Sequence, residues 1–117
     1  DLAPAMVLTN NAVTVSRPAT TATWWSTART VPSTTSIVLS ALVSAWDAAF
    51  HTLTPKIVIG GTEYAASVTT STTEDGATRF KYSFTVPATT TYKIKLSGTR
   101  TTGSNPFAVV ELIDAVN

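Results

Sequence analysis

Residues 79–86 read RFKYSFTV, and this stretch decides the fold class of the chain. Its apolar residues alternate with polar ones, and they are Phe80, Tyr82, Phe84 and Val86. Alternation over eight residues is typical of a β-strand that buries one face and exposes the other. A second alternating stretch, residues 92–98, follows after the turn-forming residues 87–91. This part of the second half of the chain is therefore predicted to be β-structure.

Turn signals surround these strands. Gly60-Gly61 permits the positive φ angles of a tight hairpin, with residues 56–59 running in and residues 62–70 running back. Asp75-Gly76 is a second turn signature. Residues 107–113 are almost continuously apolar, as in a central strand. Turns thus recur about every ten residues over the second half of the chain, a spacing typical of β-sandwiches and jelly rolls.

We therefore predict one mainly β domain over residues 1–117, an antiparallel β-sandwich of the jelly-roll or Ig-like type. Residues 36–53 leave an alternative open, because their apolar residues fit both a period of two and helical three-and-four spacing. The alanine-rich run 45–50 favours a helix on propensity. A short helix within residues 39–53 is the alternative to a strand there.

The N-terminal residues carry a second alternative. Residues 6–15 form an apolar and then alternating stretch that ends before Arg17-Pro18, and a proline cannot donate to a strand ladder. Residues 1–16 are either a strand of the chain's own sheet or an arm exchanged with a partner's open edge. Because the sequence begins at Asp1, we expect a processed protein or a segment of a longer one.

The composition indicates a hydroxyl-rich surface. Charged residues make up 13% of the 117 residues, whereas there are 24 threonines and 11 serines. Threonine suits the solvent face of a strand. The absence of cysteine favours an extracellular or virion surface location. A net charge of +1 argues against nucleic acid as a partner, and no apolar run is long enough to enter a membrane as a spanning segment.

Catalytic chemistry is poorly represented, and we predict that the chain is not an enzyme. His51 is the only histidine, and Asp47 precedes it by four residues, but no nucleophile motif accompanies them. None of the seven acidic residues lies in a sequence context that suggests a raised pKa. Glu74 and Asp75 are weak candidates for a calcium site. No other metal and no cofactor is expected.

Aromatic residues are a better lead to function. Trp46, Tyr82 and Tyr92 lie on apolar stripes and are predicted to pack in the core. Trp24 and Trp25 are consecutive, so in a strand only one of them can face a dry core. The other can stack against a sugar ring, with Arg29 as a nearby donor. The predicted ligand site is therefore Trp24, Trp25 and Arg29.

Basic residues suggest a second surface. If the strands around Phe84 and Ile94 pair as a hairpin, four basic side chains project from one face, with Arg100 just beyond. These four are Arg79, Lys81, Lys93 and Lys95. This face has two interpretations. It is either a solvated surface whose charge prevents edge aggregation, or a surface that attracts acidic polymers or a partner subunit.

Three segments carry a resemblance to known proteins: FKYSFTVPA at 80–88, TYKIKLSG at 91–98, and VVELID at 109–114. They resemble the last strands of small jelly-roll modules, which form the receptor-binding heads of bacteriophage tail fibres and many carbohydrate-binding modules. The resemblance covers about a third of the chain and implies a non-catalytic surface role, often in a homotrimer.

Two functions follow as predictions. In the first, the chain is a recognition module of a virion, such as a phage tail fibre, or of an extracellular protein, and binds a glycan or another host-surface component. In the second, it is a structural subunit of a phage tail, capsid or extracellular filament, assembled through β-strand contacts. A homo-oligomer, with a trimer favoured, fits either function.

Overall fold

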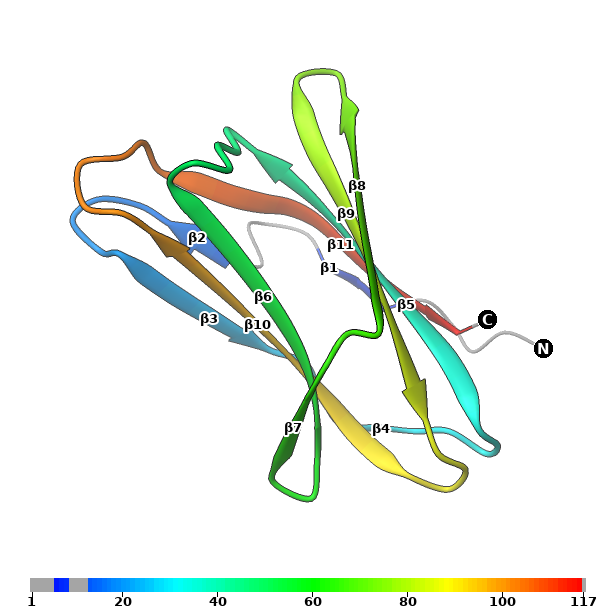
Figure 1. Ribbon diagram of the computed structural model, residues 1–117. Coiled ribbons are helices and arrows are strands. Elements are labelled where there is room, and N and C mark those ends of the chain that lie inside the picture. The colour runs from blue at the N-terminus through cyan, green and yellow to red at the C-terminus, as the bar shows by residue number, and fades with distance from the viewer. Residues whose placement is uncertain (1–5, 9–12, 117) are drawn as a thin grey trace.

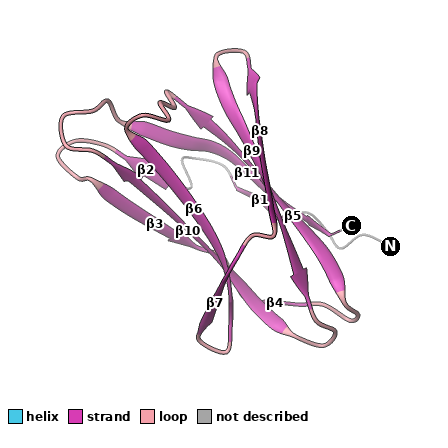
Figure 2. Cartoon of the chain, viewed as in Figure 1, coloured by secondary structure: helices cyan, strands magenta, loops and turns pink. Residues whose placement is uncertain are grey.

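The computed structural model describes residues 6–8 and 13–116, and all of its regular structure is β-strand (Figures 1 and 2). The strands are β1 (Met6–Leu8), β2 (Val13–Val15), β3 (Thr21–Trp25), β4 (Arg29–Thr30), β5 (Thr35–Ser44), β6 (His51–Ile59), β7 (Thr62–Ala65), β8 (Val68–Glu74), β9 (Ala77–Val86), β10 (Thr91–Arg100) and β11 (Phe107–Val116). The described residues include no helix that could span a membrane.

The strands form two antiparallel sheets that lie face to face. Sheet A has six strands in the order β1-β11-β5-β9-β8, with β2 beside β1 on the same flank of β11. Sheet B has five strands in the order β3-β10-β6-β7, with β4 beside β3 on the same flank of β10. The predicted antiparallel β-sandwich is thus confirmed.

The strand order decides between the two predicted types of sandwich. Along the chain β2, β3, β5 and β6 alternate between the sheets, and β9, β10 and β11 alternate again. In sheet A the order β2-β11-β5-β9, and in sheet B the order β3-β10-β6-β7, is that of an eight-stranded jelly roll. β8 adds one strand outside β9. An Ig-like arrangement would instead have the strand orders A-B-E-D in one sheet and C-F-G in the other.

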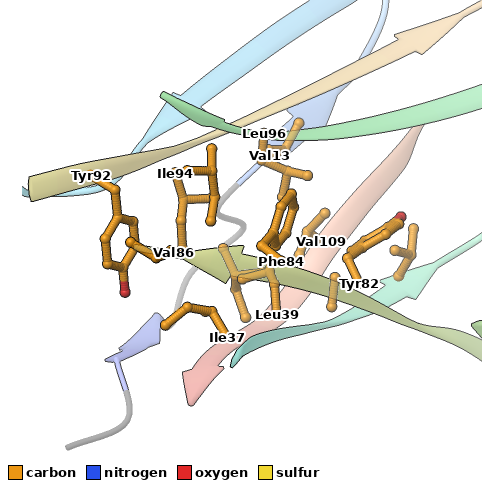
Figure 3. Close-up of a cluster of buried hydrophobic side chains, with 14 of the residues drawn as sticks. Val13, Ile37, Leu39, Tyr82, Phe84, Val86, Tyr92, Ile94, Leu96 and Val109 are labelled. Atoms are coloured by element: carbon orange, nitrogen blue, oxygen red, sulfur yellow. The ribbon is translucent and has the colours of Figure 1, made fainter. Parts of the chain in front are cut away.

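The core fills the space between the sheets. Ile37 and Leu39 of β5 point toward Ile94 and Leu96 of β10, and all four are fully buried (Figure 3). Tyr82 and Tyr92 also lie in the core, as predicted. Trp46 is only partly buried and packs at one end of the core, where its ring contacts Phe80 and Phe107.

Both predicted turns are present. Gly60 and Gly61 have φ angles of 57° and 84° and connect β6 to β7. Asp75 and Gly76 have φ angles of 48° and 80° and connect β8 to β9. Two consecutive positive φ angles are what a two-residue hairpin turn requires.

A third glycine allows the sheets to approach closely. A Cβ atom at Gly98 of β10 would lie 3.0 Å from side-chain atoms of Phe107, Val13 and Val15. These three residues belong to β11 and β2 of sheet A. The absence of a side chain at position 98 therefore lets the opposite sheet settle onto β10.

The alternative of a helix within residues 39–53 was wrong. β5 runs to Ser44. Every second residue from position 37 to position 43 points into the sandwich and is buried: Ile37, Leu39, Ala41 and Val43. Beyond it, Asp47 organises a single turn: its backbone carbonyl accepts from His51 N–H at 2.8 Å. Burial of a strand face thus outweighs the helical propensity of the alanines, because propensity is a weak preference beside tertiary packing.

The predicted hairpin between the strands around Phe84 and Ile94 was also wrong. β9 belongs to sheet A and β10 to sheet B, so Phe84 and Ile94 meet across the core. The linker crosses between the sheets and is held by Val31, whose carbonyl accepts from Thr89 N–H at 2.8 Å. The predicted return strand 62–70 likewise divides into β7 of sheet B and β8 of sheet A.

β1 and β2 both pair with β11 of the same chain. Residues 1–5 and 9–12, which belong to the predicted arm of residues 1–16, lie outside the described residues. Exchange of this arm with a partner remains a prediction.

Candidate functional site

The outer face of sheet B brings together one tryptophan and three lysines. Trp25 of β3 is directly opposite Lys95 of β10, and Lys95 is opposite Lys56 of β6. Residues paired in this way project from the same face of a sheet. Lys93 lies two residues before Lys95 on β10 and is opposite Val58. One member of the tryptophan pair and two of the four predicted basic residues, Lys93 and Lys95, therefore lie on one face.

Lys95 connects the tryptophan to the one acidic residue of this face. Its Nζ lies 5.3 Å from the centroid of the Trp25 ring and donates to Glu63 Oε2 at 2.9 Å. This hydrogen bond lowers the pKa of Glu63, and the charge of Lys56 acts in the same direction. Lys56 and Lys93 form no ion pair within the described part of the chain.

Hydroxyl groups continue the face beyond Trp25. The next row of paired positions is Thr23, Ser97 and Thr54, and the row after it is Thr21, Thr99 and Thr52. The hydroxyls of Thr23 and Ser97 share a hydrogen bond of 3.3 Å. We call the set Trp25, Lys56, Lys93, Lys95 and Glu63, with the row Thr23, Ser97 and Thr54, the Trp25 surface.

The two tryptophans point to opposite sides, as predicted. Trp24 is partly buried and packs against the core. Trp25 leaves 48% of its surface exposed, so it is the member of the pair that can contact a ligand. Sequence alone left this choice open, because either register of β3 places one ring inside and one outside.

The structure does not place Arg29 with the Trp25 surface. Arg29 is opposite the buried Tyr92, and its Nη1 donates to Asp114 Oδ2 at 2.7 Å. The Asp114 side chain is fully buried, and this ion pair joins β4 of sheet B to β11 of sheet A. Arg29 therefore makes a structural contact between the sheets, and its part in ligand binding remains a prediction.

The sequence around Asp114 does not suggest a raised pKa, but the fold raises it. Burial raises the pKa of its carboxyl, and the hydrogen bond and charge of Arg29 oppose this change. Burial, together with the nearby charge of Asp114, raises the pKa of Tyr92 to about 12. Tyr92 Oη and Asp114 Oδ1 are the two buried side-chain polar atoms that lack a hydrogen bond among the described residues.

The four residues of the predicted basic face divide between the sheets. Lys93 and Lys95 lie on sheet B, whereas Arg79 and Lys81 lie on sheet A. Arg79 donates to Glu74 at 2.7 Å, to Ser40 at 2.7 Å and to Glu111 at 2.9 Å. These acidic partners raise the pKa of Arg79. Its contacts hold the outer face of sheet A together.

Arg100 and His51 are structural residues. Arg100 is buried and donates to the carbonyls of Ala19 at 3.0 Å and Ser104 at 3.1 Å. His51 is also buried: its Nδ1 accepts from Asp47 N–H at 2.9 Å, and its Nε2 donates to the carbonyl of Asn105 at 2.6 Å. These two backbone hydrogen bonds imply that the proton of the neutral ring lies on Nε2. Because both ring nitrogens are engaged, His51 is not placed to act as a base.

No three histidine, aspartate or glutamate side chains within residues 6–8 and 13–116 gather as a metal site would require. Of the two weak calcium candidates, Glu74 accepts from Arg79, and Asp75 occupies the β8–β9 turn.

A hollow of about 420 Å³ opens between the sheets, away from the Trp25 surface. Its lining is mostly apolar and includes Ile57, Ile59, Tyr64, Phe84 and Pro87. No charged side chain lines it, so it lacks groups that would orient an ionic ligand.

Comparison with known proteins supports the fold. No protein-family model and no curated protein matches the sequence. Among solved structures, a chain in the structure of infectious bursal disease virus, Gx strain, is similar to this one, with a TM-score of 0.55 and 12% sequence identity. The similarity covers 97% of this chain and 33% of the viral chain, so this chain spans about a third of that protein's length. The described β-sandwich thus has the same fold as part of a viral protein.

Proposed function

We propose that this chain is a non-catalytic β-sandwich module of a virion or another extracellular particle, and that it assembles with neighbouring subunits through β-strand contacts. The observation that carries this proposal is the free edge formed by β8. β8 pairs with β9 on one side only, and all seven of its side chains are exposed. Figure 1 shows the β8–β9 hairpin extending past the neighbouring loops. Such an edge offers unpaired N–H and C=O groups to another strand.

The other sheet edges are poorer templates. β7 has only four residues and includes Glu63. The remaining flank of sheet B is divided between β3 and β4, and that of sheet A between β1 and β2. β8 reads VTTSTTE, without the lysine or proline that commonly protects an exposed edge.

The edge is chemically compatible with a second copy of itself. In an antiparallel pairing centred on Ser71, Thr70 faces Thr72 and Thr69 faces Thr73. Cross-strand threonine pairs are favourable, and no two like charges are opposed in this register. The single acid, Glu74, is already paired with Arg79. The contact would be two-fold symmetric and would extend sheet A across two subunits. The trimer expected from the sequence remains a prediction.

The fold likeness and the contacts of the ionisable residues support a non-catalytic role. Jelly-roll sandwiches are common in viral capsids and lectins. The lone histidine and the buried Asp114 are both engaged in contacts between strands or loops.

Replacing Ser71 with lysine should prevent association through β8. Two lysines would then face each other at the centre of the symmetric contact, and like charges at directly opposed positions are unfavourable. Sedimentation velocity over a concentration series should show self-association for the wild-type chain and a monomer for Ser71→Lys. Thr99→Lys, which adds the same charge to an exposed position of sheet B, should associate like the wild type. Equal association of wild type and Ser71→Lys would contradict the proposal.

A second function is favoured by the exposed indole of Trp25. In this proposal the Trp25 surface recognises a glycan, because an aromatic face can pack on a sugar ring while hydroxyls bind its OH groups. Trp25→Ala should abolish binding on a glycan array and leave thermal unfolding almost unchanged, since the ring is half exposed. Trp24→Ala should mainly lower stability, because Trp24 packs against the core. Unaltered glycan binding by Trp25→Ala would reject this function.

A further inference from the structure

We infer that the Trp25 surface binds an acidic polysaccharide, with a sugar ring against Trp25 and the carboxylates or sulfates of the polymer against Lys56, Lys93 and Lys95. This inference rests on the glycan-recognition function proposed above and specifies the class of glycan. It depends on the charges that the fold brings together, on the exposed indole and on the neighbouring hydroxyls.

The first argument is the arrangement of charge. Lys56 and Lys95 occupy directly opposed positions on adjacent strands, where like charges destabilise a sheet. Lys93 adds a third cation on the same face, and Glu63 is the only acid of the Trp25 surface. The three lysines exceed the one acid by two charges, although the whole chain has a net charge of only +1. Positive charge is therefore concentrated here, and an anionic ligand would relieve the repulsion.

The second argument is the position of the indole within this charge. Trp25 is 48% exposed and is opposite Lys95, whose ammonium group lies 5.3 Å from the ring centroid. A sugar ring in contact with the indole would therefore hold its own carboxylate or sulfate within reach of Lys95. The opposed Lys56 lies one strand farther, about 5 Å away across the sheet. One face thus offers a stacking surface and adjacent cations.

The third argument concerns which polyanion fits. The row of Thr23, Ser97 and Thr54 continues the surface with neutral hydroxyls, which suit the hydroxyl groups of a sugar polymer. Arginine is the residue that most often recognises phosphate in a bidentate manner. All four arginines of the chain donate to carbonyls, hydroxyls or carboxylates of described residues, and the cations of the Trp25 surface are all lysines. These features favour an acidic glycan over nucleic acid.

Binding is best measured by isothermal titration of the full chain with matched polymers. The probes are polygalacturonate, its fully methyl-esterified form, heparin, and an oligo(dT) strand. We expect binding to polygalacturonate or heparin that weakens as salt is raised, and at least tenfold weaker binding to the methyl-esterified polymer. The double variant Lys56→Gln, Lys93→Gln removes two charges without touching the Lys95–Glu63 ion pair, and it should lower affinity at least tenfold. Lys81→Gln, on the outer face of sheet A, is the control and should bind like the wild type.

The outcomes separate the inference from the function on which it rests. Equal binding of the acidic and esterified polymers, lost in Trp25→Ala, would keep glycan recognition and overturn the acidic specificity. Binding to none of the three polysaccharides would overturn the inference, and a wild-type chain that also binds nothing on the glycan array would overturn glycan recognition itself. Tighter binding to oligo(dT) than to either acidic glycan would identify a nucleic-acid surface and overturn the inference.

Discussion

Arg29→Ala is expected to lower the free energy of unfolding by about 3–5 kcal/mol, the range found when one partner of a buried ion pair is removed. Asp114 is fully buried, and in this variant it would lose the guanidinium that compensates its charge. The two residues also join the sheets, because β4 lies in sheet B and β11 in sheet A. Urea unfolding followed by tryptophan fluorescence measures the loss directly.

The loss should depend on pH in a defined direction. Burial raises the pKa of Asp114 above its ordinary value of 3.8, and Arg29 opposes this change. A carboxyl with a raised pKa in the folded state binds its proton more tightly there than in the unfolded chain. Its contribution to stability therefore falls as the pH rises through the raised pKa, and is most favourable below 3.8.

Without Arg29 the pKa of Asp114 should rise further. The variant should then lose more stability relative to wild type at neutral pH than at a pH below 3.8. Arg79→Ala is a suitable comparison, because Arg79 pairs with partly exposed acids on the surface of sheet A and should cost only about 1 kcal/mol. A loss for Arg29→Ala that is small, or that is the same at both pH values, would contradict the assignment of a buried ion pair.

Leu96→Ala is expected to cost about 2–5 kcal/mol, the range for removing a buried leucine side chain and leaving a cavity. Leu96 is fully buried at the centre of β10, with Trp24 and Pro55 at the paired positions on the two neighbouring strands. Both neighbours are fixed by the ladders of sheet B, so the site has little freedom to collapse. Chemical unfolding of the wild-type protein and of Leu96→Ala measures the difference in their free energies of unfolding.

Val68→Ala serves as the control for this core substitution. Val68 lies on the free edge strand β8 and is 55% exposed, so its loss should change stability by no more than about 0.5 kcal/mol. If the two substitutions cost the same, the core would not lie between β10 and β5 as described.

The sequence allows the individual strands of the second half to be predicted, because burial of one face leaves a period of two. Residues 80–86 are the clearest example: Tyr82, Phe84 and Val86 are buried, and Phe80 is partly buried. The turns at Gly60-Gly61 and Asp75-Gly76 were also predictable, since both require positive φ angles that these residues adopt readily.

Strand pairing could not be predicted in the same way. Alternation shows that Phe84 and Ile94 face a common interior, but it does not show whether they do so from one sheet or from two. The linker of residues 87–90 crosses between the sheets, so Arg79 and Lys81 lie on one sheet and Lys93 and Lys95 on the other. For this reason the four basic residues do not form the single face that was predicted.

The candidate site could be predicted only in part. Because consecutive residues of a strand point to opposite faces, one of the two tryptophan rings had to point outward, and it is that of Trp25. Lys56 and Glu63 were missed because they reach the surface through pairings between β10, β6 and β7 that no local pattern reveals. Asp114 was missed because a register shift between Val109 and Glu111 alters which residues of β11 face inward.

Amide hydrogen exchange at two protein concentrations tests assembly through β8 most directly. Outward-pointing amides of Val68–Glu74 should exchange quickly in dilute solution and become protected at high concentration, because a partner strand would then accept their hydrogen bonds. Amides of the short edge β7 should exchange alike at both concentrations. If the chain associates while β8 exchange stays unchanged, or if it remains monomeric at high concentration, the proposed strand contact is contradicted.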